Sequence, residues 1–243
     1  MAESSYVWSR SASTPLRPGA VPSSLGHDPE PPLRPGSPLG TRRDPRSPMS
    51  YHAERFAAAT RASGGALRLA ELPFLAQVNV RLDPKGPAAD AVGLALGFPL
   101  PLESNTVARG GELAALWLGP DEWLVVGPPG TQAEIEARLR EAIGDEHAAV
   151  VDVSSQRTTL LVAGARAGEV LAHGCSLDLH PRSFGADRCA QTTLARAHVV
   201  LVPRGELKPG FWVLVRSSFA GYLADWLLDA ASEYTNGPDT QVR

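Results

Sequence analysis

Apolar side chains recur with the period of a strand or of a helix from about residue 50 to residue 230. Residues 75–82, LAQVNVRL, alternate strictly between apolar and polar side chains, which predicts a half-buried strand. Ile135, Leu139 and Ile143 instead follow one another at four-residue spacing. That spacing predicts one apolar stripe along an amphipathic helix.

The pattern predicts six elements between residues 75 and 153. A helix from Pro87 to about Gly97 follows the first strand, because proline suits a first helical turn and glycine ends a helix. Two apolar runs around a Gly-Pro-Asp turn, residues 112–119 and 122–127, predict a hairpin. A second helix begins at Thr131, which forms a T-x-x-E capping box with Glu134, and a strand at 148–153 completes the set. This order is that of a ferredoxin-like, split βαβ module.

The second half nearly repeats this order. We expect a strand at 157–164, a helix closed by Gly174, one bent strand or two short strands at 191–203, and a strand at 211–216. Ser217 or Ser218 is expected to cap the last helix. The amphipathic stripe of that helix is formed by Phe219, Tyr222, Leu223, Trp226, Leu227 and Ala230. The fold class is therefore α+β, with two intertwined ferredoxin-like modules, and a short helix near residues 51–62 precedes them.

The two ends of the chain differ from this patterned part. Residues 1–48 contain ten of the 22 prolines and scattered apolar residues, so we expect a disordered Pro/Gly/Arg-rich tail. A docking peptide, or a translated region ahead of a start at Met49, are the alternatives. Residues 49–235 then form the α+β domain, and 236–243 a flexible C-terminal tail.

Composition and charge argue against several classes of protein, namely those that bind nucleic acid, those that bind or span a membrane, and secreted proteins built on disulfides. The net charge of the 243 residues is −3, with 23 basic and 26 acidic residues and no basic stripe, so we expect neither nucleic acid nor a membrane as a partner. No apolar run is long enough for a membrane-spanning helix, and the N-terminus has no signal-peptide core. Two cysteines do not make a disulfide framework, which favours the cytoplasm.

Motifs of catalysis and of nucleotide binding are missing. The GPPG stretch at 127–130 lacks the Gly-Lys-Ser/Thr of a phosphate loop, and its prolines remove backbone donors. There is no G-x-S-x-G and no H-E-x-x-H. Core packing is also the expected role of Trp117, Trp123, Trp212 and Trp226, with stacking on a pterin or flavin as the alternative.

Two polar groups remain as candidates for chemistry. His173, Cys175, His180 and Cys189 lie within 17 residues, but their spacing matches no familiar zinc pattern. We expect buried structural thiols, with a small metalloprotein as the alternative. The second group follows a buried strand and consists of Asp152, Ser154, Ser155 and Arg157. We favour a cap for the turn into the next strand as its role, and a binding site for a polar ligand is the alternative.

Six segments together resemble one known family, the gamma subunit of heterotetrameric sarcosine oxidase. The resemblance runs in order from about residue 47 to residue 232, and its most specific segments are WLGPDEW and GCSLDLHPR. The segments are ELPFLAQVNVRLDP (71–84), LPLESNTVARGG (100–111), LWLGPDEWLVVGPPG (116–130), VVDVSSQRTTLLVAG (150–164), HGCSLDLHPRSFGADRCAQTTLA (173–195) and FWVLVRSSFAGYLADWLLDAA (211–231).

The resemblance implies a fold similar to the folate-binding domain of the glycine-cleavage aminomethyltransferase. It also implies a complex that oxidises sarcosine to glycine with hydrogen peroxide, and passes the one-carbon unit to tetrahydrofolate or releases it as formaldehyde. In that family the alpha subunit holds the dinucleotide NAD and a folate site, beta holds FAD and FMN, and delta binds zinc. The gamma subunit is implied to be noncatalytic, to pack directly against alpha, and to carry no catalytic, cofactor-binding or metal-binding residues.

The apolar loop at residues 175–188 is the expected subunit contact. It places Leu177, Leu179, Pro181, Arg182 and Phe184 between a helix and a strand, and docking would cover those apolar side chains. The alternative function is a stand-alone protein that binds folate or transfers one-carbon units with folate, for which Asp152 is the nominated acid/base group.

Overall fold

The computed structural model describes residues 46–205 and 209–235 of the chain. The tails predicted at 1–48 and 236–243 therefore lie almost wholly outside the described residues. In chain order the elements are α1 (Ala53–Ala62), β1 (Arg68–Leu72), β2 (Ala76–Leu82), α2 (Pro87–Leu96), β3 (Val107–Gly110), β4 (Leu113–Gly119), β5 (Glu122–Gly127), α3 (Gln132–Ile143), β6 (Ala148–Asp152), β7 (Arg157–Ala163), α4 (Ala167–Ala172), β8 (Ala190–Leu194), β9 (Ala197–Pro203), β10 (Gly210–Arg216), the 3-10 turn Ser217–Phe219 and α5 (Ala220–Thr235).

Strands β2 to β6 form one antiparallel sheet in the order β3-β4-β5-β2-β6. Without the edge strand β3, this is the strand order of a ferredoxin-like module. The apolar face of β2 packs with α2 and α3, because the alternation predicted for residues 75–82 places Ala76, Val78, Val80 and Leu82 on that face. The stripe of Ile135, Leu139 and Ile143 on α3 is buried in the same cluster, as predicted.

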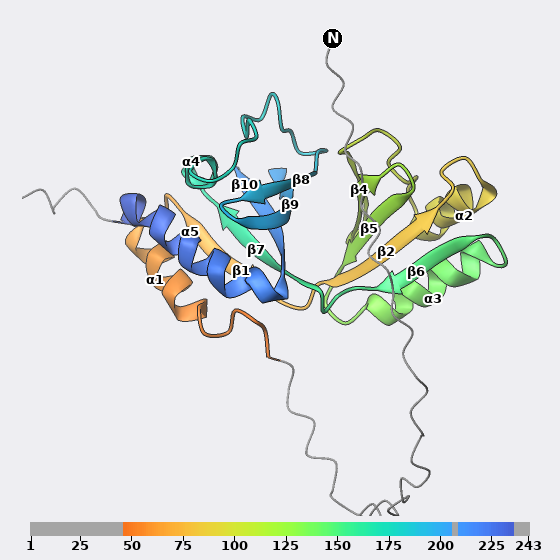
Figure 1. The fold of residues 1–243 in the computed structure, drawn as a ribbon, viewed down its shortest axis with the longest axis horizontal. Helices are drawn as coiled ribbons and strands as arrows, with labels where there is room; N and C mark the ends of the chain where they lie inside the picture. Colours follow the sequence, from red (N-terminus) through yellow and green to blue (C-terminus); the bar gives the residue numbers. More distant parts are fainter. Residues whose placement is uncertain (1–45, 206–208, 236–243) are drawn as a thin grey trace, which may run out of the picture. The chain divides into compact units, whose positions relative to one another are not determined.

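The other sheet is also antiparallel and has the order β1-β7-β10-β9-β8. It repeats the same plan, with β8 as the added edge strand, and β1 takes the place of the fourth strand of the module. Helices α1, α4 and α5 cover one face of this sheet (Figure 1). The two modules are intertwined as predicted, because β1 precedes the whole first module in the chain and yet pairs with β7 of the second.

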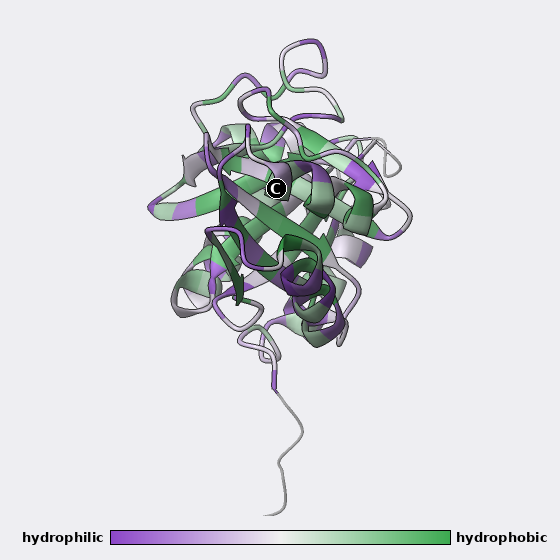
Figure 2. Ribbon diagram, turned by 90° about the vertical axis from the view of Figure 1, so that its right-hand side faces the viewer, coloured by the Kyte–Doolittle hydropathy of each residue, from purple (hydrophilic) through white to green (hydrophobic). Residues whose placement is uncertain are grey.

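A third cluster of buried residues lies between the two sheets. It joins Leu116, Leu124 and Val126 of one sheet to Val200, Val202 and Leu214 of the other. Figure 2 shows that the strands at the centre of the fold are coloured predominantly as hydrophobic. The strands in contact are therefore apolar on both faces, as expected for a sheet buried on both sides.

The hairpin predicted around Gly-Pro-Asp is formed by β4 and β5, with Trp117 opposite Trp123. Trp123 is fully buried, and its indole nitrogen donates a hydrogen bond to the carbonyl oxygen of Pro101 over 2.8 Å. Trp117, Trp212 and Trp226 are half-buried and pack against the cores. Core packing is therefore the role that the structure gives these four rings.

Several local predictions were wrong. Strands β1 and β3 were not predicted. Residues 191–203 form two strands, β8 and β9, which was one of the two alternatives for this segment. The Thr131 hydroxyl does not cap α3 but donates to Pro128 O over 2.8 Å, so the capping box is not formed. The Ser217 hydroxyl does not cap the last helix either, because it donates to Ser155 O over 2.9 Å. Among the described residues, no helix is long and apolar enough to cross a bilayer.

The predicted stripe of α5 is buried only in part. Leu223, Leu227 and Ala230 are buried, and Trp226 is half-buried. Phe219 and Tyr222 are instead 44% and 41% exposed. Both lie at the start of the helix, where the neighbouring strands have already ended.

Candidate functional site

The chain crosses twice between the sheets at one edge of the fold. It passes from β1 to β2 and returns from β6 to β7, and both connections lie near the lower centre of Figure 1. The two crossings are bonded to each other: Gln77 N donates to Ser154 Oγ over 2.9 Å, and Gln77 Nε2 donates to Arg157 O over 3.2 Å. The Gln77 side chain is 1% exposed, so this buried amide ties the crossings together.

Asp152 caps the turn that begins the second crossing. Its Oδ1 accepts hydrogen bonds from Ser154 N over 2.9 Å and from Ser154 Oγ over 2.5 Å. An aspartate that bonds the backbone two residues ahead stabilises a turn. The structure thus confirms the turn-capping interpretation of Asp152.

Two arginines lie directly opposite each other next to this turn. Arg157, the first residue of β7, pairs in register with Arg216, the last residue of β10. Burial lowers the pKa of Arg157 most, and the positive charge of Arg216 lowers it further. The negative charge of Glu122 raises this pKa and so offsets part of the shift. The side chain of Arg157 donates to Gln156 Oε1 over 2.8 Å. Among the described residues, neither arginine forms an ion pair with a carboxylate.

The loop at residues 175–188 turns much of its apolar surface inward. Leu179 and Phe184 are 9% and 8% exposed and belong to the core under α4 and α5, and Leu177 packs against that core. Only Pro181 and Arg182 of the predicted contact residues are exposed. Beside the loop lies a groove of about 870 Å³, lined largely by apolar residues of the loop, of α4 and of the β9–β10 hairpin.

The four metal-capable residues of this region do not converge. Cys175 lies in the core on the helix side of the sheet, whereas Cys189 lies in the cluster between the sheets. Cys189 Sγ contacts the carbonyl oxygens of Thr106 and Trp117, each at 3.4 Å, and burial raises the pKa of its thiol to about 11. No group of three or more metal-capable side chains occurs among the described residues.

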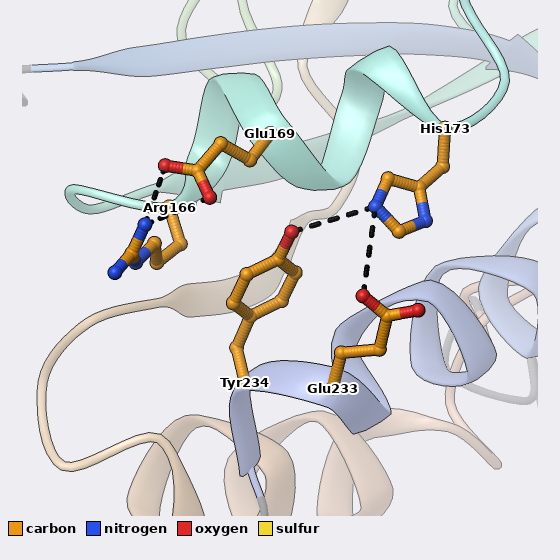
Figure 3. A network of polar contacts seen from close by, with 5 residues as sticks. All are labelled: Arg166, Glu169, His173, Glu233 and Tyr234. Atoms are coloured by element: carbon orange, nitrogen blue, oxygen red, sulfur yellow. Dashed lines mark hydrogen bonds and ion pairs between the residues drawn. The ribbon is translucent and has the colours of Figure 1, made fainter.

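A polar network on the surface joins α4 to the end of α5 (Figure 3). His173 Nε2 lies 3.4 Å from the hydroxyl of Tyr234 and 3.9 Å from Glu233 Oε2. The guanidinium of Arg166 lies 5.8 Å from the centre of the Tyr234 ring and forms an ion pair with Glu169. The His173 and Glu233 side chains are 36% and 68% exposed, so the network joins two helices at the surface.

A second exposed apolar surface lies on the other module. Leu94 of α2 is 85% exposed and Leu102 is 65% exposed. Both line a groove of about 570 Å³ together with Pro84, Phe98 and Pro99. The periodicity of α2 did not reveal this surface, because the helix carries apolar residues all around. Such helices are usually covered.

A protein-family model matches most of the described part of the chain. Residues 81–233 match the model of the sarcosine oxidase, gamma subunit family. The chain is 41% identical over 194 residues to the sarcosine oxidase subunit gamma of Corynebacterium sp. (strain P-1), a match over 79% of this chain and 93% of that protein. It is 40% identical over 192 residues to the subunit of the same name from Arthrobacter sp., over 79% and 92% of the two chains.

Solved structures agree with this match. A chain of heterotetrameric sarcosine oxidase from Corynebacterium sp. U-96, in complex with pyrrole 2-carboxylate, superposes with a TM-score of 0.75 at 35% identity, over 83% of this chain and 100% of that chain. The glycine cleavage system aminomethyltransferase T from Bartonella henselae superposes with a TM-score of 0.58 at 15% identity, over 74% of this chain and 56% of that one. The second similarity confirms the expected fold and says nothing of function.

Proposed function

The chain belongs to the sarcosine oxidase gamma subunit family, and from that premise we propose that it is the noncatalytic gamma subunit of a cytoplasmic heterotetrameric sarcosine oxidase. The observation that supports the proposal is the extent of the similarity, since 93% of a curated gamma subunit and all of a chain in the solved complex are matched at 35–41% identity.

The complex would oxidise sarcosine to glycine and reduce oxygen to hydrogen peroxide. The methyl carbon would leave as methylenetetrahydrofolate or as formaldehyde. We propose that FAD, FMN, NAD, tetrahydrofolate and zinc belong to the other subunits. The gamma chain would pack against the alpha subunit and hold the assembly together with beta and delta.

The exposed side of the 175–188 loop is one proposed contact with alpha. Because Leu179 and Phe184 fill the chain's own core, the side chains offered to a partner are Pro181, Arg182 and the half-buried Leu177. Reversing the charge of Arg182 should weaken assembly without unfolding the chain. Unchanged assembly would remove the loop from the interface.

The decisive experiment is the capture of a tagged full-length chain from its own cell. We expect a yellow eluate that contains a large and a mid-sized partner and that forms peroxide only when sarcosine is added. A colourless chain that elutes alone would contradict the proposal. A folate titration of that isolated chain would then test the stand-alone folate protein.

A further inference from the structure

All large aromatic side chains that are exposed in the described residues belong to segments that meet at one edge of the fold. Phe74 lies in the first crossing between the sheets, and Phe219 and Tyr222 lie at the start of α5. Tyr51 is next to His52, whose Nε2 lies 3.4 Å from Asp225 of α5. We call Phe74, Arg157, Arg216, Phe219 and Tyr222 the crossover edge.

The strand registers bring these residues to the same edge. Leu72 at the end of β1 pairs with Thr159 near the start of β7. Arg157 at the start of β7 pairs with Arg216 at the end of β10. Phe219 follows Arg216 by three residues, in a turn that is bonded to the second crossing through Ser217 N and Gln156 O over 3.0 Å.

The aromatic part of the crossover edge has an ordered geometry. The rings of Phe219 and Tyr222 meet edge to face, with their centroids 6.5 Å apart and an interplanar angle of 89°. Phe74 has a positive φ of 60°, which costs a bulky L-residue about 1–2 kcal/mol. Backbone strain of this kind clusters at binding sites, and here it accompanies an aromatic ring that is 44% exposed.

Within the described residues, the positive charge of the edge is compensated only in part, since Glu122 offsets some of the effect of Arg216 on the pKa of Arg157. Like charges directly opposite each other on neighbouring strands are destabilising, and Arg157 and Arg216 are such a pair. The nearby carboxylates are engaged elsewhere: Asp152 binds Ser154, Glu122 accepts from Asn79 Nδ2, Glu71 accepts from Thr158 and Ser47, and Asp225 binds Arg55 and His52. A carboxylate from outside the chain would relieve the repulsion.

From these observations we propose that the crossover edge docks another subunit of the oxidase, through a surface of that subunit in which carboxylates lie beside apolar side chains. This inference rests on the proposed function and adds the surface and the chemistry of the partner. Aromatic residues and arginine are the types enriched at the centres of protein interfaces. Rings already held in place lose little conformational freedom on binding.

The arginine pair and the aromatic rings together favour a protein over a small anion. A free phosphate or carboxylate would use the two guanidinium groups and leave Phe74, Phe219 and Tyr222 in water. A protein surface covers both kinds of side chain at once. Because a stable interface needs roughly 800 Å² on each side, the crossover edge is the centre of a larger contact.

The test compares variants of the full-length chain in their affinity for the other subunits of its own oxidase. Arg216→Glu and the double variant Phe219→Ala/Tyr222→Ala should each weaken assembly about tenfold or more, as expected of interface centres. Arg216→Lys keeps the charge and should restore most of the affinity. Raising the salt concentration should weaken the wild-type complex more than the Arg216→Gln complex, because an ion pair at a surface is screened.

Arg68→Glu is the matched control, because Arg68 is exposed at the start of β1 and lies at the end of the sheet opposite to Arg157 and Arg216; it should assemble as the wild type does. Circular dichroism and thermal unfolding of each variant check that the chain has folded. Full assembly of both Arg216→Glu and Phe219→Ala/Tyr222→Ala would overturn the inference. It would also be overturned if Leu94→Ser were the one variant that lost assembly, because the contact would then lie on α2. If the wild-type chain captures no subunit, the proposed function itself fails.

A separate measurement tests whether the pair of Arg157 and Arg216 binds a small anion instead of a subunit. Inorganic phosphate added to the isolated wild-type chain should not raise its melting temperature beyond that of Arg216→Gln. A phosphate-dependent rise that Arg216→Gln abolishes, together with unchanged assembly of both crossover variants, would assign the arginine pair to a small anion and overturn the docking role.

Discussion

The 175–188 loop and the crossover edge use large apolar side chains in opposite ways. In the loop, Phe184 and Leu179 are 8% and 9% exposed and complete the core beneath α4 and α5. At the crossover edge, Phe219 and Tyr222 are 44% and 41% exposed and pack edge to face against each other. The loop packs its apolar side chains into the core beneath α4 and α5, whereas the crossover edge lies where the strands have ended, and no other described element covers Phe219 and Tyr222 fully.

Apolar residues in a connection therefore do not by themselves mark an interface. Those that meet a neighbouring element stabilise the fold, and those that meet none remain available to a partner. Substitutions in the two regions should therefore separate folding from assembly.

The largest difference is expected between two phenylalanine variants. Phe184→Ala should lower the free energy of unfolding by about 3 kcal/mol, because it opens a cavity in the core. Phe219→Ala should lower it by less than about 1 kcal/mol, because the ring is already half in water. Urea denaturation of both full-length variants measures the difference. Equal losses would show that the two rings are equally buried in solution.

A pH dependence is expected at the end of the loop. Burial raises the pKa of the Cys189 thiol from its ordinary 9.0 to about 11. The unfolded thiol therefore ionises before the folded one, so this contribution to stability is complete below pH 9 and is lost as the pH rises to about 11. The loss should be about 2 kcal/mol.

Cys189→Ala is the matched variant for that measurement. Its stability should fall less steeply between pH 9 and pH 11, because the variant has no thiol to ionise, whatever its stability at neutral pH. Parallel curves for the two proteins would show that Cys189 is accessible to water, contrary to its 1% exposure.

The strained turn of the crossover edge allows a smaller test. At a φ of 60°, glycine is tolerated and alanine is not, so Phe74→Gly should be about 1 kcal/mol more stable than Phe74→Ala. Thermal unfolding of the two variants gives the difference. If alanine proves the more stable replacement, the backbone at residue 74 does not have the left-handed conformation in solution.

The smallest effect is expected at the cap of the second crossing. Asp152→Ala removes the acceptor of two hydrogen bonds from Ser154 and should lower the free energy of unfolding by about 0.5 kcal/mol, since the carboxylate is exposed. Asp152→Asn keeps an acceptor oxygen and should retain most of that stability. A loss above that of Phe184→Ala would contradict the role of a surface turn.

Much of the fold followed from the sequence because periodicity records which side of an element faces an apolar environment. The alternation in β2, the stripe of α3 and the Gly-Pro-Asp hairpin were each confirmed, and so was the intertwined α+β plan. The two strands that were missed, β1 and β3, are short and have no strict alternation; RLAEL becomes a strand because β7 offers it a free edge.

The sequence by itself determined the elements, their order and, through motifs such as WLGPDEW, the family. Only the tertiary structure decided which apolar side chains are covered. The loop turned Leu179 and Phe184 inward, α5 left Phe219 and Tyr222 outside, and two strands placed Arg157 opposite Arg216. The physical reason is that periodicity specifies the face of an element, whereas burial and charge pairing depend on neighbours that are distant in the chain.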